Sequence, residues 1–180
     1  MTEKDRIRLW RDEALGASGV DMLAGRCLTH RYRPHFHEEF VIATFVGGAQ
    51  QHRIGRHRGV AAPGSVMIIQ PGETHTGEAD GAEGWSYRAF YPDSRTLLEI
   101  ACDLFEGSRI RELVIDAPPV REDATLARRL AALHRLIDKN VGDPLARQQA
   151  FATAMSVSLA RLARPGASLR EATVMKGFLG

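Results

Sequence analysis

Three histidines have a spacing that suits a metal or ligand site. His35 and His37 are separated by one residue, and His75 follows the Pro71-Gly72 turn. Residues two apart on an extended strand face the same side, so His35 and His37 are expected to point into one interior. Three imidazoles on adjacent strands form a facial site for a divalent transition metal such as Zn, Ni or Fe, with a further position open to water or a ligand. The alternative is that they hydrogen-bond a bound molecule or one another, without a metal.

The aromatic run Gly84–Tyr91 offers a second set of side chains for binding. Trp85, Tyr87 and Tyr91 share one strand face by the period of two, and Arg88 lies on the other. Aromatic rings with a polar group suit a small-molecule pocket, and an arginine pairs with a carboxylate in bidentate fashion. Trp85, Tyr87 and Arg88 are therefore ligand-binding candidates, with ordinary sheet packing as the alternative for the aromatic residues.

Short apolar runs bounded by Gly and Pro indicate the strands that would position these residues. Five such runs follow one another at roughly ten-residue spacing in the first half of the chain. They cover residues 20–33, 40–46, 50–54, 65–70 and 84–91. This pattern predicts an antiparallel barrel or sandwich.

Helical periodicity replaces the strand pattern near residue 93. Thr96 and Glu99 match a capping box, which predicts a helix that ends near residue 106. A longer helix is expected over 122–141. Asp143 and Pro144 then supply an N-cap and a first helical residue for another helix, to about residue 164. The short turn between these two helices predicts an antiparallel hairpin.

Each of the two long helices carries an apolar stripe. The stripes exceed what a hairpin needs to cover one face of a barrel, so we expect them to contact a second copy of the chain. The residues assigned to this dimer contact are Leu126, Leu130, Leu133, Ile137, Met155 and Leu159.

Composition excludes several classes of protein. The net charge of this 180-residue chain is +2, and residues 1–90 hold 11 basic and 11 acidic residues, which gives no basic patch for nucleic acid. Cys27 and Cys102 form no CxxC motif, and no hydrolase or phosphate-loop motif occurs, so we expect no catalytic residues and no enzyme. The sequence has neither a secretory signal nor a long apolar run, which predicts a cytoplasmic protein with no membrane contact.

Parts of the sequence resemble the cupin motifs. Gly64, Pro71-Gly72 and His75 are similar to the second cupin motif, and the pair His35 and His37 is similar to the start of the first. Metal-binding cupins usually carry a Glu four or five residues after the second His. Val41 and Ile42 stand there, so that ligand is missing.

A closer resemblance covers roughly residues 7–164. The segments His35–Ile42, Gly64–Gly77 and Gly84–Pro92 together resemble the N-terminal ligand-binding domain of AraC-type transcriptional regulators. The resemblance implies a cupin-like barrel that binds a small-molecule effector, and helices that join two copies into a homodimer. It also implies that DNA is bound only by a helix-turn-helix module that is missing from this chain.

The resemblance also suggests how the chain is divided. Ile7–Trp10 is similar to the arm that precedes the barrel in this family, and Trp10 would close over the pocket. The expected parts are an arm (1–19), a barrel (20–93), a helical dimerisation region (94–164) and a linker (165–180). The alternative function is a stand-alone cupin metalloenzyme, an isomerase or a dioxygenase. A third hypothesis, a purely structural dimerisation module, predicts a barrel without a cavity.

Overall fold

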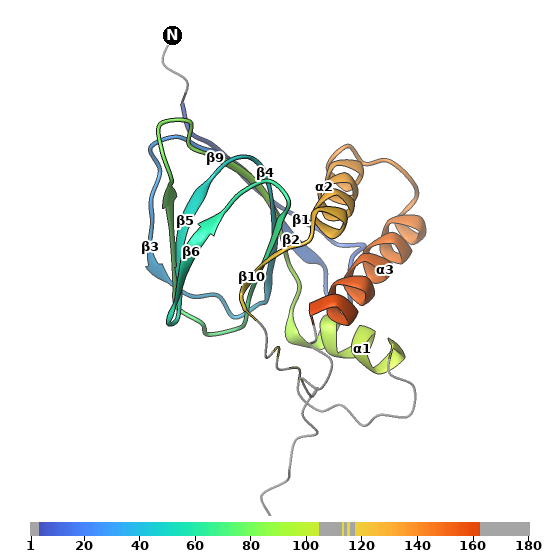
Figure 1. The fold of residues 1–180 in the computed structure, drawn as a ribbon. Helices are drawn as coiled ribbons and strands as arrows, with labels where there is room; N and C mark the ends of the chain where they lie inside the picture. Colours follow the sequence, from blue (N-terminus) through green and yellow to red (C-terminus); the bar gives the residue numbers. More distant parts are fainter. Residues whose placement is uncertain (1–3, 105–112, 114, 116–117, 163–180) are drawn as a thin grey trace, which may run out of the picture.

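The computed structural model describes residues 4–104, 113, 115 and 118–162, which form two antiparallel sheets and a group of helices (Figure 1). The strands are β1 (Arg6–Asp12), β2 (Val20–Cys27), β3 (Tyr32–His35), β4 (Val41–Gly48), β5 (Gln50–Ile54), β6 (His57–Ala61), β7 (Ser65–Ile69), β8 (His75–Ala79), β9 (Trp85–Tyr91) and β10 (Val120–Glu122). The helices are α1 (Ser94–Leu104), α2 (Ala124–Asp138) and α3 (Pro144–Leu162).

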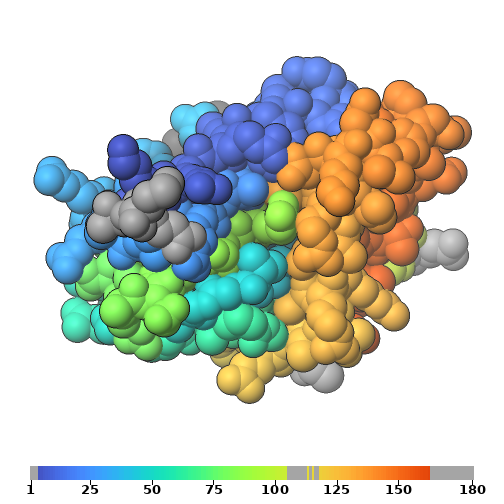
Figure 2. Space-filling model, turned by 90° about the horizontal axis from the view of Figure 1, so that it is seen from above, coloured from blue at the N-terminus to red at the C-terminus, as the bar shows by residue number. Residues whose placement is uncertain are grey.

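The molecule has three layers. One sheet has six strands in the order β1-β2-β9-β4-β7-β10, and the other has four in the order β3-β8-β5-β6. The helices cover the outer face of the six-stranded sheet, and Figure 2 shows α2 and α3 as one layer beside the strands. The fold class predicted from the sequence, an antiparallel β structure followed by a helical hairpin, is confirmed in its sandwich form.

Strand β4 shows why the six-stranded sheet lies in the middle. Its first five residues are all buried, so both of its faces are covered. Val41, Ala43 and Phe45 belong to an apolar cluster between the two sheets. Ile42 belongs instead to the cluster under the helices. A strand covered on both faces reads as a continuous apolar run, which is why this strand was recognisable in the sequence.

Aspartates begin the three helices. The Asp123 side chain accepts a hydrogen bond from the backbone N–H of Leu126 (2.9 Å), and Asp143 accepts one from that of Ala146 (2.8 Å), as expected for N-caps. The predicted cap of α1 is wrong, because Asp93 accepts from the N–H of Thr96 (2.7 Å) and the helix begins at Ser94. The predicted end near residue 106 lies outside the described residues.

The helical stripes face inward. The six side chains assigned to a dimer contact are all buried within this chain, in the cluster that joins the helices to the sheet. Leu133 and Leu159 retain only 8% and 3% of their exposed surface. Their assignment to a surface between two copies is therefore corrected: the stripes cover the sheet and one another.

The chain has strands that the sequence patterns did not separate or predict. β1 lies within the expected arm and pairs along its whole length with β2. β6, β8 and β10 are short, and their sequences show no apolar alternation. Among the described residues, no helix combines the length and the hydropathy needed to cross a membrane.

Candidate functional site

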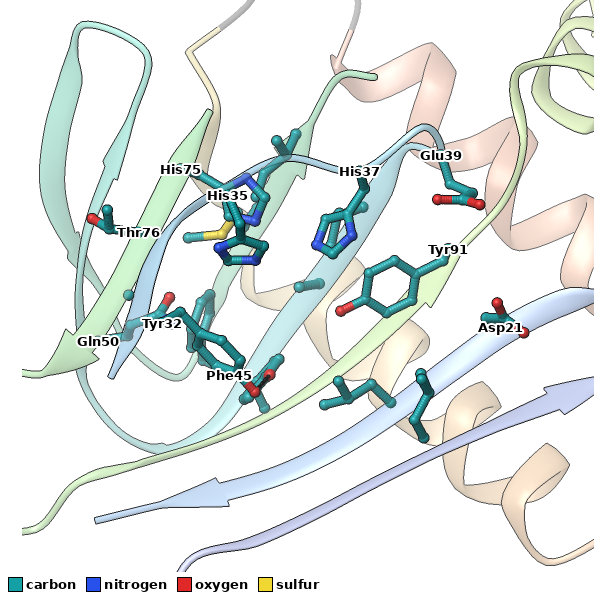
Figure 3. A pocket seen from close by; sticks show the side chains of 18 residues that line it. Asp21, Tyr32, His35, His37, Glu39, Phe45, Gln50, His75, Thr76 and Tyr91 are labelled. Carbon is teal, nitrogen blue, oxygen red and sulfur yellow. Dashed lines mark hydrogen bonds between the residues drawn. The ribbon is translucent and has the colours of Figure 1, made fainter. Parts of the chain in front are cut away.

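A cavity of about 210 Å³ lies between the two sheets, with mixed apolar and polar walls (Figure 3). Side chains of the six-stranded sheet form its apolar part: Leu9, Leu23, Val41, Ala43, Phe45, Met67 and Ile69. The polar lining residues are Asp21, Tyr32, His35, His37, Glu39, Gln50, His75, Thr76, Tyr87 and Tyr91. An apolar cavity with a few convergent polar groups is the usual form of a small-molecule site. The hypothesis of a purely structural module, which predicts no cavity, is wrong on this point.

The three histidines come together at one side of this cavity. His35, His37 and His75 each offer a ring nitrogen, and these atoms lie within 4.8 Å of one another. The ring centroids of His35 and His75 are 4.2 Å apart, and that of His37 is 5.0 and 5.1 Å from them. The arrangement that the spacing predicts, three imidazoles facing one interior, is present.

Backbone contacts fix the orientation of two of these rings. Nδ1 of His35 lies 2.7 Å from the carbonyl oxygen of Arg33, and Nδ1 of His75 lies 3.0 Å from that of Glu73. A carbonyl oxygen only accepts, so each Nδ1 carries the proton and donates it. The lone pair of each ring is then on Nε2, the atom left for a ligand or a metal.

The loops around the histidines are tied together by strand pairing and a turn. His35 of β3 is paired in register with His75 of β8. Beyond the end of β3, the His37 carbonyl accepts a hydrogen bond from the N–H of Gly72 (2.8 Å). Gly72 has φ +75°, a conformation that favours glycine, so the Pro71-Gly72 turn holds the segment of His37 beside that of His75.

Burial keeps two of the imidazoles uncharged. Burial lowers the pKa of His75 to about 4, with smaller effects from the neighbouring histidines. Burial also lowers the pKa of His37, and His35 adds to this effect. Both rings are therefore neutral at pH 7, the state in which an imidazole accepts a hydrogen bond or binds a metal.

Two tyrosines form a hydrogen-bonded pair in the cavity wall. The hydroxyl oxygens of Tyr32 and Tyr87 are 2.6 Å apart. Gly25 makes room for the Tyr87 ring, because a Cβ at residue 25 would lie 2.4 Å from a carbon of that ring. Burial raises the pKa of Tyr87, so its hydroxyl stays protonated and serves as a hydrogen-bonding group.

Of the two aromatic residues predicted to bind a ligand, Tyr87 and Trp85, only one lines the cavity. Tyr87 lines the cavity, as do His35, His37 and His75. Trp85 is fully buried on the same side of β9, but it packs beside Tyr32 and Tyr87 and does not line the cavity.

Trp10 and Arg88 lie on the opposite face of the six-stranded sheet. An Nη of Arg88 donates to Nδ1 of His134 (3.1 Å), and the guanidinium lies 3.6 Å from Asp138 on the same helix, α2. The Trp10 ring meets His134 edge to face at 5.2 Å. Both were expected in the pocket; that assignment is corrected, because β1 and β9 turn these residues toward the helices.

Other cavity residues escaped the sequence analysis. Tyr32 and Gln50 come from strands of the smaller sheet, and no local pattern singled them out. Glu39, two residues after His37, also lines the cavity and was not among the candidates. Tyr91 did share its predicted face with Tyr87, so strand parity alone would have added it to the candidates.

Two solved structures are distantly similar to this chain. The chain resembles oxalate decarboxylase of Bacillus subtilis at 16% identity over 52% of this chain and 26% of that one, with a TM-score of 0.44. It resembles KdgF from Halomonas sp. at 16% identity over 49% of this chain and 78% of that one, with a TM-score of 0.41. The chain spans about a quarter of the oxalate decarboxylase chain. No curated protein matches it.

The match to a protein family covers most of the chain. The family model described as the AraC-like ligand binding domain matches residues 19–155, which include nine of the ten strands and most of the helical layer. The cupin-like fold expected from the histidine and glycine motifs is thereby confirmed. The chain belongs to the family of AraC-like ligand-binding domains.

Proposed function

We propose that this chain is the effector-sensing part of an AraC-type transcriptional regulator, which binds a small molecule between its two sheets. The observation that carries this proposal is the cavity itself: an apolar floor faces convergent histidine and tyrosine groups in a domain of a ligand-binding family. DNA binding is assigned to a module outside this chain, and a regulator of this kind acts in the cytoplasm.

We infer that the polar side chains of the cavity bind the ligand by hydrogen bonds and that the chain is not an enzyme. The Tyr32–Tyr87 pair and the carbonyl-bound imidazoles of His35 and His75 are held in fixed orientations. A general acid or base works best with a pKa near the working pH, whereas burial raises the pKa of Tyr87 far from neutrality. Such groups suit hydrogen bonding to a ligand.

A reporter assay tests the sensor role. The chain is fused to a heterologous DNA-binding domain that represses its operator only as a dimer, and compounds that bind the chain are then added to the cells. We expect repression that changes with such a compound and fails to respond when Ala43→Leu fills the cavity. A well-expressed fusion whose repression ignores every bound compound would contradict the sensor role.

Dimerisation remains part of the proposal, on a different surface from the one first expected. Exposed apolar side chains cluster in sequence at the α2–α3 turn: Leu136, Val141 and Leu145. Isolated apolar side chains on a surface are common, but three around one turn favour a contact with a second copy. Leu145→Glu is expected to weaken the repression by the fusion, and sedimentation of the purified variant is expected to show more monomer.

The histidine cluster favours one alternative, a cupin metalloenzyme. His35, His37 and His75 fit Zn, Ni or Fe, because two Nε2 lone pairs are oriented by backbone carbonyls and all three ligand atoms are close. A bound divalent ion would act there as a Lewis acid. Elemental analysis of protein purified without an affinity tag decides this point, with His75→Ala as the site variant and exposed His57→Ala as the control. A stoichiometric metal that only His75→Ala removes supports the metal site.

A further inference from the structure

The charged groups around the cavity are all of one sign. Two carboxylates, Asp21 and Glu39, line it, and among the described residues no arginine or lysine does. Asp21 is already paired outside the cavity with Arg11, at 3.1 Å. Among the residues that the structure describes, Glu39 forms no ion pair, so no positive side chain compensates its negative charge. A ligand carboxylate or phosphate would meet this charge and find no cationic side chain in the cavity.

Aromatic rings form walls around the same space. Tyr32 and Tyr87 meet at 88°, with centroids 6.4 Å apart, and Phe45 stacks on the Tyr87 ring at 28°. On the other side, His37 meets the Tyr91 ring at 74° and 5.2 Å. Tyr32, Phe45, Tyr87 and Tyr91 all line the cavity, and the face of an aromatic ring attracts a cation through its quadrupole.

Glu39 is held beside one of these rings by the backbone. The N–H of Phe40, the next residue, donates to the carbonyl of Pro92 (3.0 Å), the residue that follows Tyr91. This bond sets the segment of Glu39 beside the end of β9. Figure 3 shows Glu39, His37 and Tyr91 along the same side of the cavity. The carboxylate raises the pKa of the Tyr91 hydroxyl, after the larger effects of burial and Tyr32, which places its charge close to that ring.

We propose that the effector is a small organic cation, an ammonium compound about the size of choline, held by Glu39 and the aromatic walls. The inference rests on the proposed function, since it takes the cavity as the effector site. The volume agrees: about 210 Å³ lies below the roughly 300–1,000 Å³ of pockets that hold drug-sized ligands, so the space suits a compact ligand. Glu39 supplies the charge, and Tyr32, Tyr87 and Tyr91 supply the ring surfaces.

Isosteric probes test the preference for positive charge. Binding of choline, 3,3-dimethylbutan-1-ol and 3,3-dimethylbutanoate to the chelator-treated chain is measured by titration calorimetry, and tetramethylammonium serves as a second cation. The first three compounds share a tert-butyl-like head and differ in charge. We expect choline to bind at least about tenfold more tightly than the alcohol, and the carboxylate not to bind measurably.

Two glutamate variants locate the source of the preference. Glu39→Gln is expected to bring choline to within about threefold of the alcohol, because it removes the charge and keeps the shape. Glu38→Gln, at the exposed neighbouring residue, is the matched control and is expected to keep the tenfold preference. Circular dichroism confirms that both variants are folded, and the comparison of probes on the unmodified chain does not depend on them.

The outcomes separate this inference from the proposed function. Binding of the alcohol as tight as that of choline overturns the cation inference and leaves a ligand-binding cavity. If neither choline nor tetramethylammonium binds, the cation inference is also overturned. The sensor role is then tested separately, by screening for other ligands of the cavity. Equal loss of preference in Glu38→Gln and Glu39→Gln would show that Glu39 is not the selecting group.

Discussion

The two faces of the six-stranded sheet are filled in different ways. Toward the helices, Phe90, Phe151 and Leu130 belong to one large buried cluster. Toward the smaller sheet, Tyr87 and Phe45 belong to a second cluster that leaves a cavity beside the histidines. Strand β9 contributes to both, with alternate residues on each face.

The face toward the helices therefore contributes mainly to folding stability, and the face toward the smaller sheet mainly to ligand binding. A closely packed face gains free energy from every buried methylene group, whereas a face with a cavity gives up part of that gain and keeps room for a ligand. Substitutions under the helices are therefore expected to affect folding first, and substitutions around the cavity are expected to affect binding first.

The largest effect is expected from a charge placed under the helices. Leu159→Glu puts an unpaired carboxylate where the leucine is 3% exposed, and we expect a loss of about 4 kcal/mol or more in the free energy of unfolding. Ala150→Glu, at an exposed residue of the same helix, is the control and is expected to change stability by less than about 0.5 kcal/mol. Urea titration measures both. Equal, small effects would mean that α3 does not pack as described.

Lowering the pH is expected to have an intermediate effect on the free energy of unfolding. His134 is fully buried on the side of α2 that faces the six-stranded sheet, and burial, with a further effect of Arg88, lowers its pKa to about 4. The unfolded chain has a histidine pKa of about 6.5, so the neutral ring stabilises the fold above that pH, and this contribution is lost as the pH falls from about 6.5 to 4. The contribution is roughly 3 kcal/mol.

His134→Gln is therefore expected to reduce the slope of stability against pH over that interval, and His75 and His37, whose pKa values burial also lowers, keep the rest of it. Exposed His57→Gln is the control and should keep the slope of the unmodified chain. The melting temperature measured at a series of pH values between 7 and 4 gives the comparison. If His134→Gln keeps the full slope, the buried neutral histidine is not its source.

The smallest effect on stability is expected in the cavity wall. Tyr32→Phe removes one hydroxyl of the Tyr32–Tyr87 pair, and we expect a loss of about 1 kcal/mol in urea titration. Its effect on ligand binding should exceed its effect on folding, in contrast to substitutions under the helices. A loss as large as that caused by Leu159→Glu would contradict the contrast between the two faces.

Local signals account for the elements that the sequence predicted well. β5, β7 and β9 were predicted within one residue at each end, because glycine and proline bound each of them. β6 and β8 were missed because their short polar sequences acquire strand structure by pairing with neighbours, β6 with β5 and β8 with β3 and β5. Pairing of this kind leaves no periodic pattern in the sequence.

The residues of the candidate site were also predicted only where a local sequence pattern marks them. His35 and His37 stood out because they are two residues apart, and His75 because it follows the Pro71-Gly72 turn. Tyr32 has no such local pattern and reaches the cavity through the path of the chain. Strand parity placed Tyr87 and Arg88 on opposite faces but did not tell which face meets the cavity. An apolar helical stripe likewise shows that a face is covered without telling what covers it, and in α2 and α3 this chain itself covers it.

One measurement tests the cavity as the ligand site most directly. Thermal-shift screening of a small-molecule library is run in parallel on the unmodified chain and on Ala43→Leu. The alanine is buried, and its side chain lines the cavity, so a leucine there fills the space without adding charge. The account predicts compounds that stabilise the unmodified chain and have no effect on a folded Ala43→Leu variant. Compounds that stabilise both proteins equally would contradict it, because their site would lie elsewhere.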